Sequence, residues 1–311
     1  MRWTTLATKP SRNLTILLMK IDSQYDIGEF LFRFYRKRCA TFLVNIYKAS
    51  ITGASRDIHR ARLDVKKILA IIDLLRIVRP KADKDPGYEK TFKKLYKASG
   101  RIREIQVNLL LLTAPEFLQY DLTQFTRALL KQESERTREF LTVIRKFDEQ
   151  KLSGIEKKIK KETGRIKPST LRKKTGRYIS YKTAICLELL EQGEGEAHLH
   201  QARQHIKELS TVLTLIFSIN PSWKFEDVIN GLNRSEMLIG DWHDKTFLAQ
   251  SLHEFLATAA DLSESQLAHA EECYRNLLAA NESHVESIIL DVRQAIAASA
   301  TDAAGTTETA I

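Results

Sequence analysis

The chain has 311 residues, 43% of them hydrophobic, with a formal net charge of +10, 12 glycines and 6 prolines. This length and apolar content allow one large core, or two modest ones of about 140 residues each. No apolar stretch approaches the roughly 18 residues of a membrane span, and the short apolar patch at 14–19 lacks a small-residue cleavage site, so the sequence predicts neither a membrane protein nor an exported one.

Long segments rich in Leu, Ile, Ala, Lys, Arg, Glu and Gln, without alternating β-branched runs, predict an all-α protein. Periodicity and the positions of the prolines predict eight helices. They span residues 24–51, 55–79, 87–113 and 117–161, then 168–191, 195–219, 223–259 and 263–298. We therefore divide the chain into an N-terminal segment (1–23), a first helical half (24–161), a second helical half (162–298) and a tail (299–311) that is expected to be disordered.

The second predicted helix carries His59, Arg62 and Lys66 at positions i, i+3 and i+7. At 100° per residue these side chains project within roughly 60° of arc. Apolar residues occupy the adjoining face, so this basic stripe lies at the margin of a packed core. Such a stripe is a candidate for lining a cavity.

The same spacing recurs 141 positions later, in His200, Arg203 and Lys207. A second pair of matching segments, around Gly100 and Gly240, is 140 positions apart. Agreement at nearly one offset predicts an internal duplication. Glycine inside a helix costs about 1 kcal/mol against alanine, so its recurrence predicts a close approach of two helix backbones.

The third predicted helix adds four cations along its length: Lys93, Lys97, Arg101 and Arg103. Glu104 and Asp244 occupy matching places in the two halves, and we expect them to orient cationic side chains, although plain interhelical ion pairs explain them nearly as well. Arg36, Arg138 and Arg145 are additional candidates for the same surface. A solvated face accounts for each of these three equally well.

Charge is distributed very unevenly along the chain. Residues 1–182 contain 42 Lys and Arg against 19 Asp and Glu, whereas residues 183–311 contain 7 against 20. A half so basic repels itself unless an anion neutralises it, which predicts a polyanionic partner. The densest run, 157–177, has 10 Lys or Arg in 21 residues and is either a solvated linker or an extension of the anion-binding surface.

The three cysteines, Cys39, Cys186 and Cys273, are far apart and show no CxxC spacing. They are typical of buried thiols in a reducing compartment. The sequence therefore predicts no metal site, no cofactor and a cytoplasmic location.

Lys and Arg on facing helices that converge on one axis suit a phosphate polyanion. Arginine offers a fork for two oxygens, whereas lysine acts as a mobile point charge. Histidines with pKa values near 6.5 would gain charge beside phosphate, because an anion favours the protonated form.

The pattern His-x-x-Arg-x-x-x-Lys-Lys, the later Gly-Arg-x-Arg segment, and the second His-x-x-Arg-x-x-x-Lys with Gly-x-x-x-Asp resemble the conserved histidine α-helical domain, CHAD, over about residues 25–298. The resemblance implies two four-helix bundles related by a pseudo-twofold, a basic central cavity, and non-enzymatic binding of inorganic polyphosphate, often with recruitment to polyphosphate granules. The residues matching the family pattern are His59, Arg62, Lys66, Lys67, Arg101, Arg103, His200, Arg203 and Lys207.

The chain departs from that pattern in several places. Leu69, Glu208 and Ser210 stand where the family usually has basic residues, and Glu104 stands where Asp is usual. The second half is therefore expected to bind anions less strongly than the first. The Glu-x-Glu-x-Lys motif of the family's frequent triphosphatase partner domain is missing from the sequence.

Two other functions remain open at this point. Basic helices would attract any phosphate backbone, so nonspecific nucleic-acid binding is an alternative, although no zinc-finger or helix-turn-helix pattern supports sequence recognition. The dipeptide His243-Asp244 also occurs in helical metal-dependent phosphohydrolases, a match of only two residues. Oligomeric state and polyphosphate chain-length preference do not follow from the sequence.

Overall fold

The computed structural model describes residues 26–80, 87–192, 196–219, 226–259 and 261–308. Within these residues the chain forms only helices, which confirms the all-α prediction. The helices are α2 (Ile27–Thr52), α3 (Ser55–Val78), α4 (Gly87–Leu111), the 3-10 turn η2 (Pro115–Phe117), α5 (Thr123–Arg145), α6 (Gln150–Thr163), α7 (Pro168–Gln192), α8 (Glu196–Ile219), α9 (Glu226–Thr258) and α10 (Glu264–Glu308).

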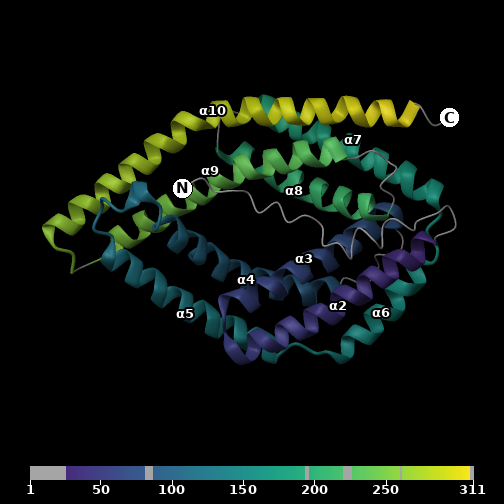
Figure 1. Cartoon of the computed structure of the whole chain (residues 1–311), viewed down its shortest axis with the longest axis horizontal. Helices are drawn as coiled ribbons and strands as arrows, with labels where there is room; N and C mark the ends of the chain where they lie inside the picture. Colours follow the sequence, from purple (N-terminus) through teal and green to yellow (C-terminus); the bar gives the residue numbers. More distant parts are fainter. Residues whose placement is uncertain (1–25, 81–86, 193–195, 220–225, 260, 309–311) are drawn as a thin grey trace.

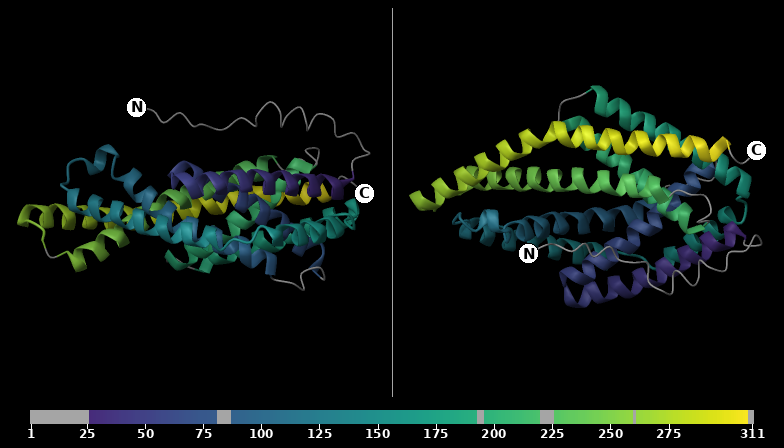
Figure 2. Two further views of the ribbon diagram at one scale, coloured as in Figure 1. Left: turned by 90° about the horizontal axis from the view of Figure 1, so that it is seen from below. Right: turned by 45° about the horizontal axis from the view of Figure 1, so that its top comes forward.

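Successive helices pack on one another in two series. In the first series α2 packs on α3, α3 on α4 and α4 on α5, and α6 then returns along α2. In the second series α7 packs on α8, α8 on α9 and α9 on α10, and α10 also contacts α7. The two series lie side by side in an elongated molecule (Figure 1), which is flat when seen from below (Figure 2). They meet where α3 contacts α8 and where α4 contacts α9.

Three apolar clusters hold these helices together. The first lies among α2 to α6 and includes Phe42, whose ring packs edge-on against Phe92 and Phe147 at 5.8 and 5.4 Å between centroids. This first cluster also takes in the carboxyl-terminal part of α8, from Val212 to Ile219. The second cluster joins α7, α8, α9 and α10. The third joins the far ends of α4 and α5 to those of α9 and α10, with Phe125 as one of its members. Apolar packing therefore links the two series at both ends of the molecule.

The packing of α2 on α6 depends on a glycine. Asp26 caps α2 by accepting a hydrogen bond from the backbone N–H of Gly28 at 2.8 Å. A Cβ atom added at Gly28 would lie 2.4 Å from the carbonyl oxygen of Thr163, at the end of α6. Only a residue without a side chain lets the two backbones approach so closely.

The single helix predicted over 117–161 is wrong. The helical structure is interrupted before α5 and again between α5 and α6. Shortly before each new helix an aspartate side chain accepts a backbone hydrogen bond, Asp121 from the N–H of Thr123 and Asp148 from the N–H of Gln150. Phe147, in the second break, packs into the first cluster. The packing of this partly buried ring and the hydrogen bond from the N–H of Gln150 to the Asp148 side chain outweigh the helical propensity of the surrounding residues.

The other predicted helices agree with the structure to within a few residues, except at the end of the chain. There α10 continues to Glu308, ten residues beyond the predicted end at 298. None of the helices in the described part of the chain combines the length and apolarity that crossing a membrane requires.

The sequence predicted three buried cysteine thiols. Cys186 and Cys273 are buried and Cys39 is partly buried, and all three are free thiols. Burial raises the pKa of Cys186 to about 12 and those of Cys39 and Cys273 to about 11. Thiols with such pKa values are almost fully protonated near neutral pH and therefore unreactive.

Candidate functional site

Arg62 is fixed against α4. Its Nη1 donates to the carbonyl oxygen of Tyr96 at 2.5 Å and reaches the Ser99 hydroxyl at 3.5 Å. The guanidinium carbon also lies 3.9 Å from the centroid of the Tyr96 ring. Both hydrogen bonds come from Nη1, which is one end of the guanidinium group. The stacking on the Tyr96 ring fixes the orientation of the rest of that group.

Gly100 makes room for this arginine. A Cβ atom at Gly100 would lie 3.2 Å from Nη1 of Arg62, whereas one at Gly240 would meet nothing within 4 Å. The predicted close approach of two backbones is therefore wrong at both glycines. At Gly100 the neighbour is a side chain that belongs to the basic stripe.

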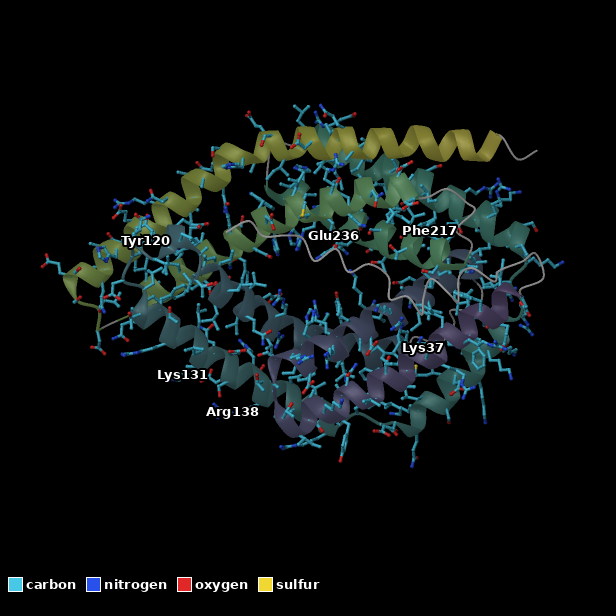
Figure 3. The ribbon with its side chains drawn as sticks, in the orientation of Figure 1. Lys37, Tyr120, Lys131, Arg138, Phe217 and Glu236 are labelled. Atoms are coloured by element: carbon cyan, nitrogen blue, oxygen red, sulfur yellow. The ribbon has the colours of Figure 1, made fainter. Side chains whose placement is uncertain are left out.

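Lys66 lies one turn after Arg62 on α3 and is half-buried. Its Nζ is 3.9 Å from a carboxylate oxygen of Glu236, which belongs to α9. Figure 3 shows Glu236 on the edge of α9 that faces α3 and α4. The first basic stripe thus reaches across to the second series of helices.

The corresponding cations of α8, Arg203 and Lys207, are also half-buried. Desolvation lowers the pKa of Lys207 to about 8, helped by the positive charges of Arg203, Lys66 and Arg62 and opposed by Glu236. Desolvation lowers the pKa of Arg203 too. Because the charges of Arg62 and Lys66 act on Lys207, the two basic stripes lie within electrostatic reach of each other.

Glu104 of α4 and Asp244 of α9 border the same region. Desolvation raises the pKa of both carboxyl groups. The charges of Arg62 and Arg101 oppose this rise at Glu104, and those of Arg203 and Lys207 oppose it at Asp244. Both carboxylates therefore lie among cations of the two stripes, as the orienting role requires.

Two histidines of this region, His59 and His243, have lowered pKa values. Desolvation, Arg103 and Arg62 lower the pKa of His59. His243, whose ring centroid is 5.1 Å from that of His200, has its pKa lowered to about 4 by desolvation and by the neighbouring cations, with Arg203 the largest. The imidazoles of His59 and His243 are therefore neutral near pH 7 while no anion is bound.

We use the name central cluster for Lys207 and the other cations whose charges act on His59, Lys207 or Asp244. The central cluster consists of Arg62, Lys66, Arg103, Arg203 and Lys207. The structure brings these five predicted residues together from three helices.

The remaining predicted cations lie elsewhere. Lys67 follows Lys66 on α3, but desolvation and then Arg38 of α2 are the largest causes that lower its pKa. Arg101 is 3.7 Å from Glu139 of α5, and Arg36 is 3.0 Å from Glu156 of α6. Exposed positions on α4 and α5 are occupied by Lys93, Lys97, Arg138 and Arg145. Figure 3 shows Arg138 on the outer edge of α5, away from the central cluster.

The sequence matches no protein-family model and no curated protein. The fold aligns with the crystal structure of the CHAD domain from the plant Ricinus communis, with a TM-score of 0.66, over 89% of this chain and 94% of that chain. The protein has a CHAD-like fold. Sequence identity in this alignment is 14%, so the likeness concerns the fold.

Within this CHAD-like fold, the two departures expected to weaken the second half have other partners. Glu208 is 2.6 Å from Nζ of Lys182 on α7, and that amine is also 2.8 Å from Nδ1 of His205. Ser210 donates to the side chain of Asn233 at 3.0 Å. Glu208 and Ser210 are therefore engaged away from the central cluster.

A further acidic residue at the central cluster, besides Glu104 and Asp244, is Glu236, which was not predicted from the sequence. A signal was present, because Glu236 follows Tyr96 by 140 positions, the same offset that relates Gly240 to Gly100. The CHAD-like fold thus places an aromatic ring beside the basic stripe in one series and a carboxylate in the other.

His243 and Asp244, the basis of the phosphohydrolase alternative, lie beside Arg203 and Lys207. Among the residues that the structure describes, no group of three or more His, Cys, Asp or Glu side chains is arranged to hold a metal ion. In this CHAD-like fold the surroundings of the dipeptide are cationic, which favours an anion there.

Replacing Lys207 by methionine should change how stability depends on pH. Folded Lys207 loses its proton near pH 8, whereas the unfolded chain keeps it up to the usual pKa of 10.5. Between these two values the unfolded state binds more protons, so the contribution of Lys207 to the free energy of unfolding rises with pH. We expect Lys207→Met to be more stable than wild type below pH 8 and to lose this advantage as pH rises through the window.

Urea titrations on both sides of the window measure this effect. Lys131→Met, at an exposed position of α5, is the control and should show no such change with pH. If the difference between Lys207→Met and wild type stayed constant across the window, the electrostatic origin of the shift would be wrong.

Proposed function

We propose that this protein binds inorganic polyphosphate, without converting it, through the central cluster between its two series of helices. We further propose that the two series are copies of one four-helix unit. The packing order of the two series is similar if α5 and α6 together take the place of α10, and this similarity and the spacing of 141 positions between the basic stripes support the duplication.

The observation that carries the proposal is the electrostatic state of Lys207. Positive charges from both stripes act on one half-buried amine and contribute to lowering its pKa to about 8. Like charges held together under partial burial destabilise the folded state unless an anion compensates them. Bringing a polyanion into the central cluster would relieve this repulsion and favour the protonated form of Lys207.

The arrangement suits a chain of phosphates better than a single phosphate. The cations come from α3, α4 and α8, and they include both guanidinium forks and ammonium groups. A linear polymer with a charge on every unit can contact several of these groups at once, and each contact releases counterions. We extend the proposal to recruitment of the protein to polyphosphate granules in the cytoplasm.

The test is a titration with long-chain polyphosphate at two ionic strengths. Arg62→Ala with Lys66→Ala should weaken binding about thirtyfold at roughly 0.15 M salt. The slope of log affinity against log salt should become shallower by about 1.8, the change for two lost phosphate contacts. The matched control is Arg127→Ala with Lys131→Ala, which removes the same two residue types at the same spacing of four from an exposed face of α5.

The control pair should bind like wild type and keep the wild-type salt slope. The pair Arg203→Ala with Lys207→Ala should weaken binding less than the α3 pair, because Asp244 and Glu236 both neutralise part of the charge of Arg203 and the lowered pKa of Lys207 reduces the charge of its amine. If the α5 pair and the α3 pair weakened binding equally, the polymer would be attracted by overall charge and the central cluster would not be its site.

A further inference from the structure

Glu236 of α9 is, with Asp244, one of the carboxylates whose charges act on the cations of the central cluster. It lies 3.9 Å from the amine of Lys66 on α3, and its charge also acts on Arg203 and Lys207 of α8. A single carboxylate thus faces cations of both basic stripes. The side chain of Glu236 is 24% exposed, so its carboxylate is only partly hydrated there.

The contact with Lys66 is loose. A distance of 3.9 Å is long for a charge-assisted hydrogen bond, which normally measures about 2.7–2.9 Å between nitrogen and oxygen. By comparison, Lys182 of α7 and Glu208 of α8 are 2.6 Å apart. Glu236 therefore behaves as a counterion shared among several cations and not as one half of a tight pair.

The equivalent position in the first series has no charge. Tyr96, 140 positions before Glu236, receives a hydrogen bond from Arg62 through its backbone and stacks its ring under the guanidinium. An aromatic ring holds a cation in place without cancelling its charge. The second series has a carboxylate instead, so the two stripes differ in net charge although their cations match.

We propose that Glu236 is a tethered anion that occupies part of the polyphosphate site and competes with the incoming polymer. This inference rests on the proposed function of the central cluster. A phosphate group that approaches Lys66, Arg203 or Lys207 must displace the carboxylate or accept its repulsion. Glu236 therefore weakens polyphosphate binding and holds back binding of small anions, which offer too little charge to replace it.

The expected effect has a definite sign and size. Glu236→Gln keeps the shape of the side chain and removes its charge, so one more cation of the cluster becomes available to the polymer. Affinity for long-chain polyphosphate should rise about fivefold at roughly 0.15 M salt, and the salt slope should steepen by about 0.9, the change for one additional phosphate contact. Inorganic pyrophosphate should also gain affinity.

Glu254→Gln is the matched control. It makes the same chemical change on the same helix, 18 residues further along α9, or about 27 Å at 1.5 Å per residue. Glu254 accepts a hydrogen bond from Gln250 and lies in the distal part of the molecule, so its replacement should leave affinity and salt slope unchanged.

The outcomes separate this inference from the function on which it rests. If wild type binds polyphosphate and the α3 pair weakens binding, but Glu236→Gln binds equally or more weakly, then Glu236 is a strut that positions Lys66 and the competition model is wrong. If wild type does not bind polyphosphate, the proposed function itself fails. A gain in affinity equal in Glu236→Gln and Glu254→Gln would indicate a general effect of net charge and would also overturn the inference.

Discussion

Replacing Arg62, Lys66, Arg203 and Lys207 together by glutamine should reduce polyphosphate affinity by several hundredfold, up to about a thousandfold, at roughly 0.15 M salt. Each cation that contacts a phosphate releases counterions, and four lost contacts account for nearly three powers of ten at that salt concentration. Glutamine keeps much of the length of these half-buried side chains while removing their charge. The measurement is a polyphosphate titration at several salt concentrations, with circular dichroism and a thermal melt to verify the fold.

Competition by short duplex DNA completes this experiment. If DNA displaces polyphosphate from the wild type at equal phosphate concentration, the protein is a general binder of phosphate backbones and the polyphosphate proposal fails. If the variant with all four substitutions remains folded and its polyphosphate affinity stays within tenfold of that of the wild type, the central cluster is not where the polymer binds.

Gly28→Ala should cost about 3 kcal/mol of folding stability or more. The new methyl group would lie 2.4 Å from the carbonyl oxygen of Thr163 and 2.8 Å from its carbonyl carbon, both backbone atoms that cannot rotate away. Relief requires α2 to move away from α6, which loosens the first apolar cluster. Urea titration monitored by circular dichroism measures the loss.

Gly154→Ala on α6 is the matched control, because a Cβ atom there would meet nothing within 4 Å. Inside an exposed helix this change should stabilise the protein by about 0.5–1 kcal/mol. Equal effects at the two glycines would show that the backbones of α2 and α6 do not approach as closely as described.

The sequence was sufficient to predict the helices and the two basic stripes because both depend on local spacing. Helical periodicity places Arg62 and Lys66 on one face of α3 whatever surrounds that helix. The same spacing in Arg203 and Lys207 indicated a second face of the same kind. That the cations of α3 and α8 act on one another also follows from this pairing, once the two helices pack together.

Features that depend on tertiary contacts were not predicted. The break before α6 arises because Phe147 finds a buried position beside Phe42, and nothing in the local pattern reveals that position. Gly100 was assigned to a backbone crossing because the sequence does not show that Arg62 fills the space beside it. Glu236 was overlooked because the residue 140 positions before it, Tyr96, is of a different type, and only the contact of Glu236 with Lys66 of α3 gives it significance.

The third apolar cluster has a mechanical consequence for the central cluster. It joins the two series of helices at one end of the molecule, while the carboxyl-terminal part of α8 is buried in the first series towards the other end. Apolar packing thus holds the helices that carry the cations together on both sides of the central cluster. This packing holds the two basic stripes next to each other, so a polymer bound there as proposed would meet cations at a spacing that the fold sets.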